Sequence, residues 1–309
     1  MVREHGEVRP RVGVSACLLG EPVRYDGGHK RQPWSEALAD EVEWVRVCPE
    51  VELGLGVPRE TIQLEARGDD VALVATETRR ELTEAMRTWA CERAEALAAE
   101  GLDGYVFKAR SPSCGWGTTP VVGSAAARDG LFAEAVRRRF PSLPVADEET
   151  LADAPARETF RRKVCAHREL RALFHPGWTR GEAVDFHTKR KLLLMAHSPQ
   201  AYAELGSWVG RMAAVEPEEF ERRYVELFLR ALGEEATPGR HANALAHAAG
   251  YFSQSLPPQE RNELTAATEA LGRGEGDLEA LKARILAAAR QFGQTYLEQQ
   301  LYLAPSKSR

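Results

Sequence analysis

The chain has 309 residues, of which 43% are hydrophobic, and a formal net charge of −5. No apolar run is long enough to span a bilayer and residues 1–7 are polar, so the sequence predicts neither a membrane anchor nor a signal peptide. Five cysteines, an odd number, fit reduced thiols better than a disulfide framework, and we expect a cytoplasmic protein of two domains.

Short β-branched runs alternate with amphipathic segments over the first half of the chain. The spacing predicts strands at residues 12–17, 43–47, 105–108 and 143–147, a hairpin joining 61–64 to 71–74, and helices at 33–38, 78–100 and 130–140. This alternation is typical of an α/β domain with a parallel or mixed sheet and flanking helices, which we place at residues 1–152. Cys91 lies beside the apolar stripe of the long predicted helix, and we assign it to the core.

The second half of the chain has helical periodicity in nearly every segment. Residues 153–309 are therefore expected to form an all-α domain. The predicted helices cover residues 157–173, 182–197, 199–212, 217–232, 239–254, 258–271 and 277–301. Cys165, inside the first of them, is interpreted as a structural or incidental thiol.

Three cysteines, Cys17, Cys48 and Cys114, each follow a predicted strand. Because the carboxyl ends of parallel strands share one edge of a sheet, we expect the three thiolates to line one crevice. Three thiolates can hold zinc with a fourth ligand, or a [4Fe–4S] cluster that leaves one iron open. The chain has no close Cys-x-x-Cys pair of the kind that structural zinc sites use, and ligands so far apart in sequence suit a cluster assembled by the whole fold.

Acidic and hydroxyl side chains stand next to two of these cysteines. Glu50 and Glu52 follow Cys48, whereas Ser111 and Ser113 precede Cys114. A carboxylate beside an open metal position is suited to activate water as a general base, and a hydroxyl helps to carry protons. A merely structural metal site needs no base, so this neighbourhood favours an enzyme.

Two charged segments are candidates for contact with a ligand. The loop after residue 20 contains Arg24, Tyr25 and Asp26, which suit an anionic or heteroaromatic ligand, although a solvated loop has a similar composition. Residues 157–191 hold ten basic and four acidic side chains, so this window is net +6 in a protein of net −5. A basic window in an acidic protein indicates a polyanion such as nucleic acid, or simply a charged helix surface.

Three separated motifs resemble the bacterial 2-thiouracil desulfidase family. They are residues 15–20 (SACLLG) with 24–27 (RYDG), residues 48–50 (CPE) and residues 111–115 (SPSCG). The resemblance covers about residues 10–150. Residues 186–189 (FHTK), 193–199 (LLMAHSP) and 240–243 (RHAN) resemble a helical domain that is often fused to that family.

The resemblance implies a [4Fe–4S] cluster on the three cysteines, with one iron that has no protein ligand and takes the sulfur of a thiolated pyrimidine. It implies that a carboxylate activates water, that sulfur leaves as hydrosulfide, and that a serine moves protons. By position relative to the cysteines, Glu52 and Ser111 match these roles best, with Glu50 as the rival base. Two-domain members resemble a tRNA 4-thiouridine desulfidase, which agrees with the basic window.

Three functional hypotheses follow. The first is a desulfidase acting on 4-thiouridine in tRNA, with Arg24, Tyr25, Asp26 and Ser113 at the base and Lys189, Arg190 and Lys191 on the tRNA. The second is a desulfidase of free thiouracil-type bases, with the helical half as a scaffold. The third is a nucleic-acid-binding or redox-sensing protein with a structural cluster.

Overall fold

The structure, a computed structural model, describes residues 9–252 and 254–305. The expectation about residues 1–7 therefore lies outside the described residues. The chain divides into two compact units, Met1–Arg168 and Glu169–Arg309. Across the described residues, no helix combines the length and the apolar character needed to cross a bilayer.

A four-stranded parallel sheet forms the centre of the first unit. Its strand order is β2 (Glu43–Val47), β1 (Arg11–Ser15), β5 (Gly104–Phe107) and β7 (Val145–Asp147), so β1 lies between β2 and β5. Gly13 of β1 pairs with Tyr105 of β5, and a Cβ at Gly13 would lie 2.2 Å from the tyrosine ring, so only glycine fits there. The predicted parallel or mixed sheet is confirmed.

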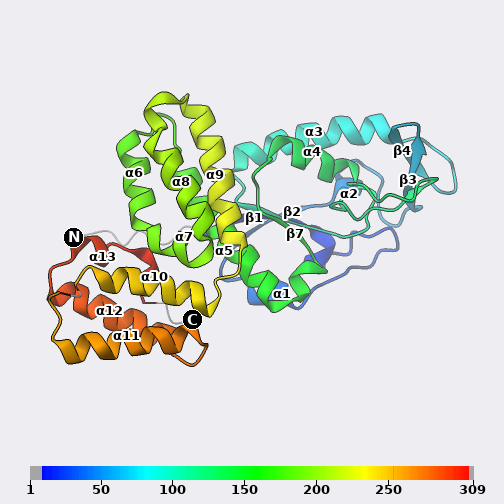
Figure 1. Cartoon of the computed structure of the whole chain (residues 1–309). Coiled ribbons are helices and arrows are strands. Elements are labelled where there is room, and N and C mark those ends of the chain that lie inside the picture. The colour runs from blue at the N-terminus through cyan, green and yellow to red at the C-terminus, as the bar shows by residue number, and fades with distance from the viewer. Residues whose placement is uncertain (1–8, 253, 306–309) are drawn as a thin grey trace, which may run out of the picture. The chain divides into compact units, whose positions relative to one another are not determined.

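Helices cover both faces of this sheet (Figure 1). On one face α1 (Trp34–Ala37) and α5 (Ala154–Leu173) pack through Trp34 and Phe160 against the β1 valines. On the other face α3 (Thr83–Glu100) and α4 (Leu131–Arg139) pack through small and aromatic side chains against Tyr105 and Phe107. Burial on both faces explains why the strand sequences are nearly continuous apolar runs.

A smaller sheet stands apart from the parallel one. The predicted hairpin is confirmed as β3 (Ile62–Arg67) paired antiparallel with β4 (Asp70–Ala75). The two-residue strand β6 (Val121–Val122) adds to β3 in parallel, and the sequence analysis missed it because so short a run has no measurable periodicity.

The second unit is all-helical within the described residues, as predicted (Figure 1). Its elements after α5 are α6 (Arg180–Lys189), α7 (Lys191–His197), α8 (Pro199–Gly210), η3 (Met212–Ala214), α9 (Pro217–Gly233), α10 (Pro238–Gly250), α11 (Pro258–Gly272), α12 (Leu278–Gln291), α13 (Thr295–Glu298) and η4 (Leu301–Leu303).

Two predicted helices are each divided in the structure. The segment 182–197 breaks at Arg190, where the buried Gln300 amide accepts the N–H of Leu192 (3.2 Å) and donates to the C=O of Thr188 (2.7 Å). A distant side chain thus satisfies the backbone groups that the break releases. The segment 277–301 ends its long helix before Gly293, whose φ of +63° requires glycine.

Candidate functional site

The three strand-end cysteines line one pocket at the carboxyl edge of the parallel sheet. Cys17 lies in η1 (Ala16–Leu19) directly after β1, Cys48 caps the one-turn helix α2 (Pro49–Glu52) after β2, and Cys114 lies in the loop after β5. The chain leaves the central strand β1 toward β2 on one side, and β5 lies on the other. This is the switch point at which open α/β sheets hold their ligands.

Burial and neighbouring charges shift the pKa of each of the three thiols. Burial raises the pKa of Cys17 to about 11, and the charge of Cys48 adds to the rise. Burial likewise raises the pKa of Cys48, and it raises the pKa of Cys114 well above its usual range, with Cys48 and Cys17 adding to the effect. Added positive charge, such as a metal centre, would favour the thiolate form of all three.

Among the described residues, the three cysteines do not form a compact site for one ion. Within residues 9–252 and 254–305, no three His, Cys, Asp or Glu side chains converge closely enough to hold a single metal ion. A cubane cluster presents its irons at separate corners and accepts thiolates that stand farther apart. A donor set of three separated thiols is compatible with a cubane cluster.

Glu50 is the carboxylate of the pocket. Its side chain lines the pocket together with the cysteines, and Ser113 donates its hydroxyl to Glu50 Oε1 at 3.1 Å. Arg59 donates to Glu50 Oε2 from Nε at 2.8 Å, with Nη2 at 2.6 Å from the same oxygen. Ser113 is fully buried, so it contributes through Glu50 rather than through the pocket wall.

Glu52 faces a different part of the structure. Its Oε1 accepts the backbone N–H of Cys48 at 3.1 Å, and its Oε2 lies 3.2 Å from Nε of Arg93 on α3. It is not among the residues that line the pocket. Glu52 thus anchors the turn that carries Cys48.

Ser111 lies at the pocket wall, as expected for a residue near the reacting atoms. Its Oγ accepts the N–H groups of Ser113 (3.3 Å) and Cys114 (3.1 Å). Because both lone pairs accept hydrogen bonds, the Ser111 hydroxyl can form a further hydrogen bond only as a donor.

The loop residues of the predicted site separate into two groups. Arg24 and Tyr25 line the pocket, and the ring of Tyr25 is 41% exposed. Asp26 does not line it, because its carboxylate accepts the N–H of Gly28 at 3.0 Å, a bond that lowers its pKa.

Two cationic residues of the pocket, Arg59 and Lys108, were missed by the sequence analysis. Lys108 follows β5 directly and its Nζ is paired with Glu148. Its position at the end of a strand could have predicted that it lies at the site, as the same position did for the cysteines. Arg59 follows a glycine-rich segment whose path the sequence pattern does not predict.

The three basic residues proposed to contact tRNA lie in the second unit. Lys189 Nζ is 2.6 Å from Asp185, and Arg190 Nη2 is 2.6 Å from Glu169 while its guanidinium lies 3.5 Å from the centre of the Phe186 ring. Lys191 is half-buried at the start of α7. Both acidic partners belong to the window and are already counted in its net +6, so these ion pairs engage Lys189 and Arg190 without changing that sum.

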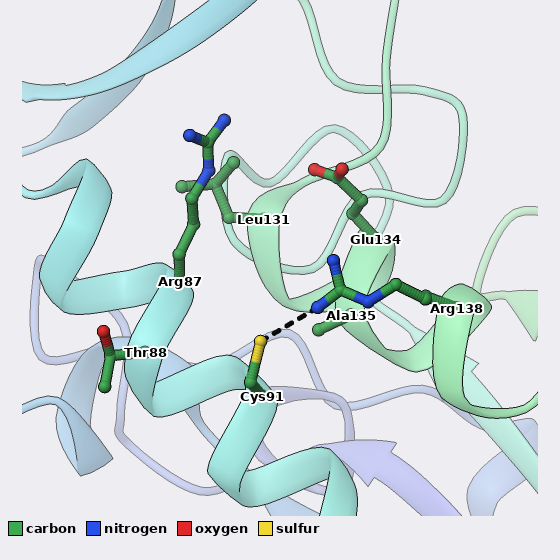
Figure 2. Close-up of a pocket in the computed structure, with 7 residues that line it drawn as sticks. All are labelled: Arg87, Thr88, Cys91, Leu131, Glu134, Ala135 and Arg138. Carbon is green, nitrogen blue, oxygen red and sulfur yellow. Dashed lines mark hydrogen bonds between the residues drawn. The ribbon is translucent and has the colours of Figure 1, made fainter.

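The assignment of Cys91 to the core is wrong. Its helix α3 buries Met86, Ala90, Ala94 and Leu97, and Cys91 lies one residue beyond this stripe, where it is exposed. Figure 2 shows Cys91 facing α4, where Arg138 Nη2 donates to its sulfur at 2.9 Å. Cys165 is half-buried within α5.

Family comparisons cover both halves of the chain. Residues 12–148 match the model of the family described as 2-thiouracil desulfurase, and residues 191–306 match a second family described as a protein of unknown function, DUF1722. The chain belongs to the 2-thiouracil desulfurase family and carries a DUF1722 domain in its helical half. The expected family relationship is thereby confirmed.

Individual proteins are similar to parts of the chain. The uncharacterized protein YbgA of Escherichia coli (strain K12) is 31% identical over 141 residues, which is 45% of this chain and 83% of the relative. The uncharacterized protein YbbK of Bacillus subtilis (strain 168) is 32% identical over 109 residues, which is 34% of this chain and 72% of the relative. A solved structure titled [4Fe-4S]-dependent thiouracil desulfidase TudS has 34% identity, covers 49% of this chain and 99% of its own, and has a TM-score of 0.40.

Proposed function

We propose that this protein is a hydrolytic desulfidase of thiolated pyrimidines that works with a [4Fe–4S] cluster held by Cys17, Cys48 and Cys114. The observation that carries the proposal is that these three cysteines line the same pocket as Glu50 and Ser111. A structural cluster has no use for a carboxylate and a hydroxyl in its pocket. The membership of the N-terminal half in the 2-thiouracil desulfurase family supports the same reaction class.

The overall reaction exchanges a carbon–sulfur double bond for a carbon–oxygen double bond. Water supplies the oxygen, sulfur leaves as hydrosulfide, and no oxidant or reductant is required. When bound, a cluster with one iron free of protein ligands supplies a Lewis acid for the thiocarbonyl sulfur.

The chain's own residues handle the water and the protons. We assign the general base to Glu50 rather than to Glu52, because Glu50 lines the pocket and Glu52 is bonded to Arg93 and the Cys48 backbone. Ser111, whose oxygen is held by two backbone N–H groups, relays a proton to the leaving sulfur and regains one from the proton that Glu50 has taken from water, so the hydroxyl is unchanged after the reaction. Arg24 and the exposed ring of Tyr25 hold the pyrimidine at the mouth of the pocket.

The finer proposal is that the substrate is 4-thiouridine within tRNA. The net +6 window over residues 157–191 supports it, although Lys189 and Arg190 have acidic partners. A free thiouracil-type base is the second candidate, because every residue assigned to the chemistry lies in the first unit.

The cluster assignment is tested by single Cys→Ser substitutions, each followed by anaerobic reconstitution. Variants at Cys17, Cys48 and Cys114 should lose iron and the cluster's visible absorbance, whereas variants at Cys91 and Cys165 should retain both. The matched controls are cysteines on helices outside the pocket. A Cys48→Ser protein with the parent's iron content contradicts the assignment.

The substrate class is tested by incubating the reconstituted protein with thiolated tRNA and with free thiouracil side by side. Release of hydrosulfide from either establishes a desulfidase, and the ratio of kcat/KM values identifies the preferred substrate. A loaded protein that releases no sulfide from either supports a structural or sensing cluster instead.

A further inference from the structure

Arg59 lines the pocket beside Glu50 and joins three segments around it. Its side chain is only 6% exposed. Nε and Nη2 contact Glu50 Oε2, Nη2 also donates to the C=O of Val23 at 3.0 Å, and Nη1 donates to the C=O of Gly56 at 2.9 Å. The backbone N–H of Arg59 donates to the C=O of Tyr25 at 2.9 Å.

These contacts tie two parts of the pocket together. Val23 and Tyr25 belong to the loop that follows Cys17 and carries Arg24, whereas Glu50 belongs to the turn that follows Cys48. A guanidinium has five N–H donors in a fixed plane, so its position sets the loop and the carboxylate relative to each other. A lysine ammonium, a single point charge, lacks this geometry.

The same contacts determine which lone pair of the Glu50 carboxylate is left to accept a hydrogen bond. Oε2 is occupied by two donors of Arg59, and Oε1 receives one hydrogen bond from Ser113. A carboxylate oxygen has two lone-pair directions, so Oε1 keeps one for a further donor such as water.

We propose that Arg59 is the positioning residue of the reaction: its guanidinium orients the Glu50 carboxylate toward the attacking water and couples that orientation to the Val23–Tyr25 loop. The inference rests on the proposed desulfidase activity and on Glu50 as its base. Arg59 acts through Glu50, so its contribution disappears when Glu50 no longer serves as a base. A residue that only stabilises the fold has an effect independent of Glu50.

The decisive experiment is a double-mutant cycle in the full, cluster-loaded chain, with Arg59→Lys and Glu50→Gln made singly and together. We expect Arg59→Lys to keep its iron and to lose about 10²-fold in kcat, the size of effect that a small misplacement of a catalytic group causes. In the double variant, Arg59→Lys should cause no loss of kcat beyond that of Glu50→Gln alone. Arg79→Ala, which breaks another arginine–glutamate pair (2.7 Å to Glu65) remote from the pocket, should keep the parent's rate.

Chemical rescue provides a second test of the same role. Arg59→Ala leaves a space that a guanidinium ion fills, so millimolar guanidinium should restore much of the lost rate. The same addition should leave Glu50→Gln and Arg79→Ala unchanged. If Arg59→Ala fails to load its cluster, the Arg59→Lys cycle alone decides.

A third readout needs no turnover. Hydrogen exchange at the amides of Gly27 and Arg59, which bond to the C=O groups of Arg24 and Tyr25, should be faster in Arg59→Lys than in the parent and unchanged in Arg79→Ala.

The outcomes separate the two proposals. If the parent releases sulfide and Arg59→Lys matches its rate, or if the Glu50 and Arg59 effects multiply, the inference about Arg59 is overturned. If the parent releases no sulfide from any thiolated pyrimidine, the proposed function fails. In that case unchanged exchange in Arg59→Lys overturns the coupling to the loop, and faster exchange supports it.

Discussion

Glu50 and Glu52 are two positions apart, yet their carboxylates serve different parts of the first unit. Both lie in α2, a single helical turn, and residues two apart on a helix do not share a side. On an extended segment they would point the same way. The sequence analysis favoured Glu52 from its position relative to Cys48 in the family resemblance. It did not predict this turn, even though Pro49 after Cys48 is a typical start for one.

A matched pair of substitutions distinguishes their roles. We expect Glu50→Gln to keep its iron and lose about 10²–10⁴-fold in rate, the usual effect of removing a general base. Glu52→Gln should keep a rate close to the parent's and unfold at a lower temperature, because its pairing with Arg93 is weakened. The measurement is kcat/KM per bound iron together with a thermal melt. An inactive Glu52→Gln beside an active Glu50→Gln would assign the base to Glu52.

At the scale of elements, the loop that carries Cys114 is packed directly against the start of α4. Gly130 is the N-cap of α4, and a Cβ there would lie 2.5 Å from the carbonyl carbon of Ser113 and 2.8 Å from the N of Cys114. Backbone atoms cannot give way as a flexible side chain does, so the loop must shift to admit a methyl group. The shape of one wall of the pocket therefore depends on a glycine sixteen positions downstream.

Gly130→Ala should destabilise the protein by about 1–3 kcal/mol, as overpacking does, and lower its iron content by displacing Cys114. Gly206→Ala is the control, since Gly206 lies inside α8 with nothing within 4 Å of its added Cβ. That substitution should be neutral or stabilise by up to about 1 kcal/mol. Thermal unfolding and iron analysis of both variants check the prediction. Parental iron in Gly130→Ala would mean that the loop tolerates the shift.

The elements that could be predicted from sequence are those whose signal is local. Residues 43–47 form β2 as predicted. The position of the three cysteines after strands could also be predicted, because the apolar pattern shows where each strand ends, and the three strands are adjacent in the sheet. The break at Arg190 could not be predicted, because the groups that satisfy it belong to Gln300. Arg59 was missed for the same reason, since its partners Val23 and Glu50 are brought to it by the fold.

At the scale of the whole molecule, charge is distributed unevenly along the chain. The whole chain has a net charge of −5, whereas residues 157–191 have a net charge of +6. Ion pairs with Asp185 and Glu169 engage two of the basic side chains, while the net charge of the window already includes both acidic partners. Arg190 is 11% exposed, is paired with Glu169 and is stacked on Phe186, so its removal would disturb packing as well as charge. Lys189 and Lys191 are the better residues on which to test binding.

Replacing Lys189 and Lys191 by Ala should weaken binding of tRNA and reduce the slope of log K against log salt by about one unit for each phosphate that is no longer neutralised. Release of sulfide from a free thiolated base should be unchanged, because the residues assigned to the chemistry lie in the first unit. Arg284→Ala is the control, since this exposed arginine of α12 pairs with Glu263 outside the window. Binding is measured by titration at several salt concentrations. Parental affinity and slope in the double variant would show that this part of the second unit does not contact tRNA. Equal losses in Arg284→Ala would indicate a nonspecific charge effect.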